Sequence, residues 1–188
     1  MMRVSQERAA SRSTAVRYRA AEFALLLIGA HCGRCGCAAE SVHFWLPDDH
    51  EASYADEGRA DHWQCAGSAA LVYGVVELDR QTRVRLRTLV PTYRWQSVDD
   101  DVPCYRNSCE HCGLAIAGLE DEEYRLGLGS LLCHSDVPPP LLVVTVATTL
   151  RVSALGWTAG DLADAVAGRI RGERATRRPA PGPGQPSR

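Results

Sequence analysis

The sequence predicts a mainly β protein of the α+β class, with a small β domain built around a metal ion. Two C-x-x-C-G units, at residues 32–36 and 109–113, stand on either side of a β-rich stretch. Short runs rich in Val and Leu have the length of strands, and one amphipathic stretch near the end has the period of a helix. These three observations define the predicted class.

We expect four regions along the 188 residues. Residues 1–21 form a basic arm and residues 22–135 form the β domain. Residues 136–174 add a strand and a short helix as a C-terminal extension. Residues 175–188 are rich in Pro and Gly, so we expect a disordered tail there.

The β domain begins with an apolar run, residues 22–30, that we interpret as the first strand. Its Arg-rich leader makes it similar to a secretory signal as well, and the alternative is a secreted protein. The run is short, carries Glu22 and follows an unusually long leader, which favours the strand. Ser41–Leu46 is the next expected strand, and the acidic residues 47–61 are expected to form an exposed loop.

Residues 69–90 predict a hairpin inserted between the two cysteine units. ALVYGVVELD and TRVRLRTLV are β-rich runs separated by the polar pair Arg80-Gln81. In the second run apolar residues alternate with Arg83, Arg85 and Arg87, a period of two that is typical of a strand with one wet face. A second acidic loop, residues 97–104, leads into the second unit.

The extension is expected to contain a buried strand at residues 141–152 and a helix after it. Thr158 and Asp161 have the spacing of a capping box, with Thr158 as N-cap. The following apolar residues recur every fourth position, which predicts one buried helical stripe that ends near Gly172. The stripe consists of Leu162, Val166 and Ile170.

Charge is distributed unevenly along the chain. The first and last 20 residues hold 11 of the 21 Arg, and the remaining residues have 10 Arg against 21 acidic residues. An acidic body disfavours binding to nucleic acid, because affinity there depends on cations at phosphates. The alternative is a nucleic-acid-binding protein that uses Arg83, Arg85, Arg87 and the basic ends. No apolar run reaches the 18 or so residues that a membrane span requires.

Four of the eight cysteines are the predicted ligands of one structural Zn²⁺. Two thiolates three positions apart in a tight turn can face one tetrahedral ion, and the Gly after the second Cys permits a left-handed backbone. Two such units make a closed four-thiolate site. The alternatives are a disulfide framework or separate redox pairs. The predicted ligands are Cys32, Cys35, Cys109 and Cys112.

The other four cysteines, at positions 37, 65, 104 and 133, are expected to be buried free thiols. The alternative is a second metal site formed by Cys65, Cys104 and Cys133 with His62 or His134. Cys65 would begin a third C-x-x-C unit, but Ser68 stands at the fourth position. Residues 62–68 (HWQCAGS) are therefore interpreted as strand sequence with one thiol and no metal ion.

The order of these motifs resembles uncharacterised bacterial zinc-ribbon proteins with repeated C-x-x-C-G knuckles, from about Glu22 to Glu123. In those proteins W-x-C commonly continues as W-x-C-x-x-C, where this chain has Ser68. The resemblance implies a zinc-stabilised β module and implies no reaction. It is carried by Cys32, Cys35, Gly36, Trp63, Cys65, Tyr105, Asn107, Cys109, Cys112 and Gly113.

The sequence thus predicts a binding module stabilised by structural zinc, with a protein partner, no catalytic residues and a location in the reducing cytoplasm. The enzymatic alternative is a zinc-dependent hydrolase or nuclease with a second, open metal site. Asp49-His50 and Asp61-His62 would supply water-activating groups, but no H-E-x-x-H motif accompanies them.

Overall fold

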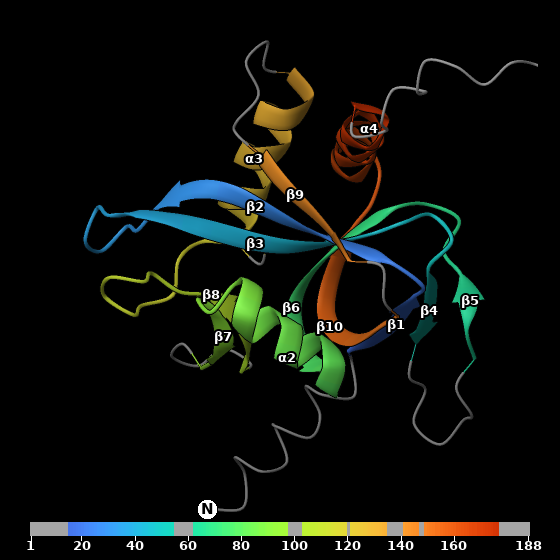
Figure 1. The fold of residues 1–188 in the computed structure, drawn as a ribbon, viewed down its shortest axis with the longest axis horizontal. Coiled ribbons are helices and arrows are strands. Elements are labelled where there is room, and N and C mark those ends of the chain that lie inside the picture. The colour runs from blue at the N-terminus through green and yellow to red at the C-terminus, as the bar shows by residue number, and fades with distance from the viewer. Residues whose placement is uncertain are drawn as a thin grey trace, which may run out of the picture.

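The computed structural model describes residues 15–54, 62–97, 103–119, 121–134, 141–146 and 149–176. Antiparallel strands dominate it, and helices cover the sheet, which confirms the predicted mainly β, α+β class (Figure 1). The strands are β1 Val16–Ala20, β2 Phe23–His31, β3 Ala38–Leu46, β4 Glu51–Tyr54, β5 Gln64–Cys65, β6 Ala70–Leu78, β7 Tyr93–Gln96, β8 Cys104–Asn107, β9 Leu141–Val146 and β10 Leu150–Thr158. The helices are α2 Arg80–Leu89, α3 Glu122–His134 and α4 Asp161–Thr176.

The strands form one antiparallel sheet in the order β5-β4-β1-β10-β6-β3-β2-β9, and β8 joins β7 to β6. β10 lies between β1 and β6, and β9 pairs with β2 from Phe23↔Val146 to Ile28↔Leu141. The sequence analysis expected a single strand at residues 141–152, but two strands, β9 and β10, form there, and both lie beside strands of the predicted β domain.

Both faces of the sheet are covered, which explains why β2 is apolar throughout. Alternate residues of a strand point to opposite faces. Phe23 and Leu25 pack in one core with Leu86 of α2, whereas Leu26 and Ile28 pack in a second core with α3 and α4. In Figure 1, α2 accordingly lies on the opposite side of the sheet from α3 and α4.

The C-terminal helix confirms the predicted apolar stripe but not its predicted start. Leu162, Val166 and Ile170 are all buried against the sheet. Thr158 is the last residue of β10 rather than an N-cap, and α4 begins at Asp161. The strand continues to Thr158 because its backbone pairs with β6 at Leu71.

Residues 80–89 form helix α2, so the strand predicted there is wrong. Asp79 caps the helix by accepting a hydrogen bond from the Thr82 amide at 2.9 Å. Thr82 and Leu86, four residues apart, supply the buried face. The helix places Arg83 and Arg87 on one side and turns Arg85 away from them, because neighbours on a helix are three or four positions apart.

Three further segments differ from the predictions. Residues 16–20, expected within a helical or disordered arm, form β1, and residues 51–54 of the expected loop form β4. Both are strands because β1 pairs with β10 on one side and with β4 on the other. The helix α3 was not predicted. The remaining parts of the predicted arm, loops and tail, at 1–14, 55–61, 98–102 and 177–188, lie outside the described residues.

Candidate metal centre

The first C-x-x-C-G unit is the turn of the hairpin formed by β2 and β3. The strands pair without interruption up to His31↔Ala38. The Cys32 amide donates to the Cys37 carbonyl at 2.9 Å, and the Gly36 amide donates to the Cys32 carbonyl at 2.8 Å. Gly36 has a φ of 69°, in the left-handed region that favours glycine. We call residues 32–37 the first knuckle.

The second unit follows β8 and repeats this local geometry. The Cys109 amide donates to the Leu114 carbonyl at 2.8 Å, and the Gly113 amide donates to the Cys109 carbonyl at 2.8 Å. Gly113 has a φ of 75°. We call residues 109–114 the second knuckle. The left-handed glycine expected after each C-x-x-C pair is therefore confirmed at both positions.

The fold brings the four predicted ligands together, at the end of the β2–β3 hairpin (Figure 1). The sulfur atoms of Cys32 and Cys112 are 3.6 Å apart, as are those of Cys35 and Cys109. All four sulfurs lie within 4.8 Å of one another. A tetrahedral ion with Zn–S bonds near 2.3 Å separates its sulfurs by about 3.8 Å. The cluster therefore has the donor atoms and the size that zinc requires.

These distances also bear on the disulfide alternative. A disulfide bond brings two sulfur atoms to about 2.05 Å, far closer than the pairs observed here. All four cysteines of the cluster are free thiols in the structure. Cys32 and Cys109 are buried beside Ile116, whereas Cys35 and Cys112 are exposed. One side of the cluster is thus sealed by protein.

The electrostatics of the cluster favour a bound cation. Amides of Cys35 and Arg34 donate to the Cys32 sulfur and lower the pKa of that thiol to about 6. The amide of Cys37 lowers the pKa of Cys35, but partial desolvation and the thiols of Cys109, Cys32 and Cys37 together raise it to about 12. The protein alone therefore stabilises the thiolate form of Cys32 but not that of Cys35. A cation bound between the sulfurs would stabilise the remaining thiolates.

Asn107 fixes the second knuckle to the hairpin that carries the first. Its side chain is buried, accepts a hydrogen bond from the Val42 amide at 2.7 Å and donates to the Val42 carbonyl at 3.2 Å. The amide group thus pairs with β3 in the way that the backbone of a neighbouring strand would. Sequence analysis included Asn107 only within the resemblance and gave it no role.

The Asn107 side chain also belongs to a network of polar side chains that includes Ser41, His43 and Tyr124. The Nε2 atom of His43 is 2.8 Å from the Ser41 hydroxyl and 3.3 Å from the Tyr124 hydroxyl of α3. The Asn107 side chain also donates to Ser41, at 3.3 Å. Burial lowers the pKa of His43 to about 3, so the ring is neutral at physiological pH. Its role here is structural.

Arg94 on β7 holds the second knuckle from outside. Its Nη2 donates to the Gly113 carbonyl at 2.8 Å, and its Nε donates to the Ser108 hydroxyl at 3.1 Å. Nothing in the local sequence marks Arg94, because the contact depends on pairing between β7 and β8. Sequence reasoning therefore missed it.

The remaining cysteines do not join the cluster in the described part of the chain. Cys104 is buried beside Ala15 and Val76, so its predicted burial is confirmed. Cys65 is exposed, so its predicted burial is wrong, and Cys37 is half-buried. The two-residue strand β5 ends at Cys65 and has no core to pack into. The side chains of Cys133 and His134 lie outside the described residues.

The stretch HWQCAGS forms β5 and a turn, with Gly67 at a φ of 70°. Within the described residues, the four-cysteine cluster is the single group of three or more His, Cys, Asp or Glu side chains placed to share an ion. His50 is buried, and its Nδ1 lies 2.6 Å from the Pro47 carbonyl. That contact gives His50 a structural role at the end of a turn.

Comparison of the chain with protein-family models, with curated proteins and with solved structures finds no match. The resemblance to zinc-ribbon proteins therefore stays a prediction. None of the helices in the described part of the chain combines the length and the apolar character that a membrane span needs.

Proposed function

We propose that the protein binds one structural Zn²⁺ through Cys32, Cys35, Cys109 and Cys112 and works as a binding module. The observation that carries this proposal is the approach of four thiol sulfurs to within 4.8 Å of one another. Four thiolates fill a tetrahedral zinc ion and leave no position for water. Such an ion contributes to folding rather than to a reaction.

A non-catalytic role follows from that saturated coordination. The hydrolase or nuclease alternative needs a second, open site, and the described residues offer no second cluster of ligands. The thiolate ligands require a reducing environment, so we place the protein in the cytoplasm. A basic protein is the partner that would complement the acidic body of the chain.

Native mass spectrometry of the purified chain tests the zinc site. We expect one zinc per wild-type chain and none in Cys32→Ser or Cys109→Ser, because each knuckle supplies half of the ligands. Cys37→Ser is the matched control: this half-buried thiol belongs to the first knuckle but not to the four-cysteine cluster, so its loss should leave the zinc content unchanged.

Retention of zinc by both ligand variants, or absence of zinc from wild type purified under reducing conditions, would overturn the proposal. Two zinc ions per wild-type chain would favour the hydrolase alternative, because the four remaining cysteines form no second ligand cluster within the described residues that could close the coordination of another ion.

A further inference from the structure

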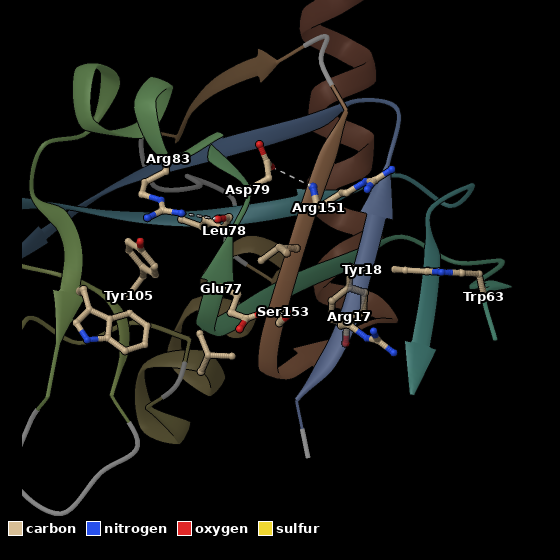
Figure 2. A pocket seen from close by; sticks show the side chains of 13 residues that line it. Arg17, Tyr18, Trp63, Glu77, Leu78, Asp79, Arg83, Tyr105, Arg151 and Ser153 are labelled. Carbon is tan, nitrogen blue, oxygen red and sulfur yellow. Dashed lines mark hydrogen bonds between the residues drawn. The ribbon is translucent and has the colours of Figure 1, made fainter. Parts of the chain in front are cut away.

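A cleft of about 700 Å³ that contains none of the four clustered cysteines is lined by residues of β1, β6, β7, β8, β10 and α2 and of the segments next to them (Figure 2). Arg83, Asp79 and Arg151 lie along one rim in this view. Tyr105 and Trp63 stand at opposite ends, with Glu77 and Ser153 between them. The volume is within the range of small-molecule sites, roughly 300–1,000 Å³.

A β-bulge shapes the floor of this cleft. Glu77 pairs with Ser153 and Val75 pairs with Ala154, so Val76 is an extra residue on β6. Consecutive residues of a regular strand point to opposite faces, yet Val76 and Glu77 both line the cleft. Bulges redirect side chains in this way and are common beside functional sites.

Aromatic rings form one wall of the cleft and extend from the core to the surface. Tyr93 stacks on Tyr105 with ring centroids 5.9 Å apart, and Trp95 meets Tyr105 edge-on at 5.4 Å. Trp95 remains 43% exposed. A smaller hollow of about 210 Å³ shares Trp95, Tyr105 and Arg83 with the cleft and adds Arg87. The Trp95 indole is therefore held in place by its contact with Tyr105, and part of its surface stays exposed for a ligand.

At the opposite end of the cleft, Trp63 is also held in place by neighbouring side chains. The Arg19 guanidinium lies 4.4 Å from the centroid of the Trp63 ring, and two of its nitrogens donate to the Glu51 carboxylate. The cation thus orients Trp63 at the end of the cleft that faces away from Tyr105.

Three arginines, Arg17, Arg83 and Arg151, and two acidic residues, Glu77 and Asp79, line the cleft, and this slight positive balance contrasts with the acidic body. Arg83 donates one hydrogen bond, to the Leu78 carbonyl at 3.2 Å, and Arg151 is exposed. Neither side chain has an ion-pair partner within the described residues. The Asp79 carboxylate accepts hydrogen bonds from the backbone amides of Thr82 and Arg151 rather than from a guanidinium group. Donors of Arg83 and Arg151 therefore remain available to an anion.

We propose that this cleft binds a nucleotide unit, with its ring against Trp95 and its phosphate at Arg83 and Arg151. An inorganic anion alone would leave the exposed indole without a role, and a cationic ligand would leave the donors of Arg83 and Arg151 without a partner. The exposed Glu77 carboxylate, 3.2 Å from the Ser153 hydroxyl, can accept N–H groups of a base. Aromatic side chains beside cations are the usual platform for single nucleotides of a strand.

This inference supplies a ligand class for the proposed binding module, but it does not depend on the metal. The ligand is either a free mononucleotide or a nucleotide within a single strand, and the chemistry at the cleft is the same for both. The phosphate contacts predict binding that weakens as salt is added.

Calorimetric titration of the full-length, zinc-loaded chain at low and high salt tests the inference. The probes are AMP, adenosine, inorganic phosphate and a hexadeoxyadenylate strand. We expect AMP or the strand to bind, with Trp95→Leu and Arg151→Gln each weakening affinity by about tenfold or more. Arg85→Gln is the matched control, because Arg85 lies on the opposite side of α2 from Arg83.

Binding of AMP would assign the cleft to free nucleotides, and binding of the strand alone would assign it to single-stranded nucleic acid. The inference is overturned if neither binds, if adenosine or phosphate binds as tightly as AMP, or if Arg85→Gln weakens binding as much as Arg151→Gln. Zinc content measured on the same samples shows whether a failure concerns the cleft alone or the metal site as well.

Discussion

The two knuckles have the same local geometry but are held in place by different means. In each, the first Cys amide donates to a carbonyl five residues ahead, and the Gly amide donates back to the first Cys carbonyl. The first knuckle closes a hairpin of two nine-residue strands. The second follows the four-residue strand β8 and relies on the side chains of Asn107 and Arg94.

This difference shows that a C-x-x-C-G sequence specifies a turn but not the position of its partner. The hairpin fixes the first knuckle through local backbone pairing. The second knuckle is brought to it across more than 70 residues of chain by buried side-chain contacts. Changes to those contacts should therefore affect the second knuckle more than equivalent changes near the first.

The largest effect is expected from Asn107→Leu. This change leaves the Val42 amide and carbonyl without their buried partner, and such loss costs about 1–3 kcal/mol per group. We expect the free energy of unfolding to fall by about 2–4 kcal/mol. Urea denaturation should show this fall with zinc and also with a chelator, because the anchor does not depend on the ion.

The control for this prediction is Gln96→Leu on β7, where a half-buried amide donates its hydrogen bond to the Ser108 hydroxyl and not to the β2–β3 hairpin. If Asn107→Leu destabilises the protein no more than Gln96→Leu does, then Asn107 does not anchor the second knuckle.

A smaller effect concerns His43 and depends on pH. Burial lowers the pKa of His43 from 6.5 to about 3. Between these values the unfolded chain binds one more proton than the folded chain, so stability falls as pH falls. The slope is about 1.4 kcal/mol per pH unit. His43→Gln keeps a polar contact for Ser41 but cannot titrate.

We therefore expect the free energy of unfolding to fall less steeply between pH 6 and pH 5 in His43→Gln than in wild type. Urea denaturation at several pH values measures this difference, and release of zinc at low pH contributes to both proteins alike. Equal slopes would mean that His43 titrates normally in the folded state.

The smallest effect compares the two glycines directly. A left-handed backbone disfavours any other residue by about 1 kcal/mol, so Gly36→Ala and Gly113→Ala should both destabilise the protein. A Cβ on residue 36 has open space, whereas one on residue 113 would lie 3.2 Å from the Arg94 Nη2. Gly113→Ala should therefore cost more, by a few tenths of a kcal/mol.

Thermal denaturation of both variants, in wild type and in an Arg94→Ala background, measures this difference. Removal of Arg94 should make the two glycine changes equal. A difference that persists without Arg94 would have another cause.

Several elements follow from the sequence because their determinants are local. The two C-x-x-C-G units, with the glycine that each turn requires, mark Cys32, Cys35, Cys109 and Cys112 as candidate ligands. The apolar runs at residues 22–30 and 41–46 identify β2 and β3. The stripe of Leu162, Val166 and Ile170 identifies the buried face of α4.

Residues 80–89 show where local patterns fail. Alternation of Arg with Val and Leu is compatible with a strand, but Thr82 and Leu86 also share one side of a helix. The cap at Asp79 and the burial of Leu86 in the core shared with β2 select the helix. Those contacts are made between distant segments, so the period alone cannot decide between the two structures.

The sequence by itself thus determined which residues can bind a metal, how each knuckle turns and which runs are buried. Tertiary structure alone decided that the knuckles meet, that Asn107 and Arg94 hold the second one, and that Arg83, Arg151 and Trp95 line one cleft. The reason is physical: a tight turn depends on neighbouring residues, whereas a site depends on strand pairing between residues far apart in the chain.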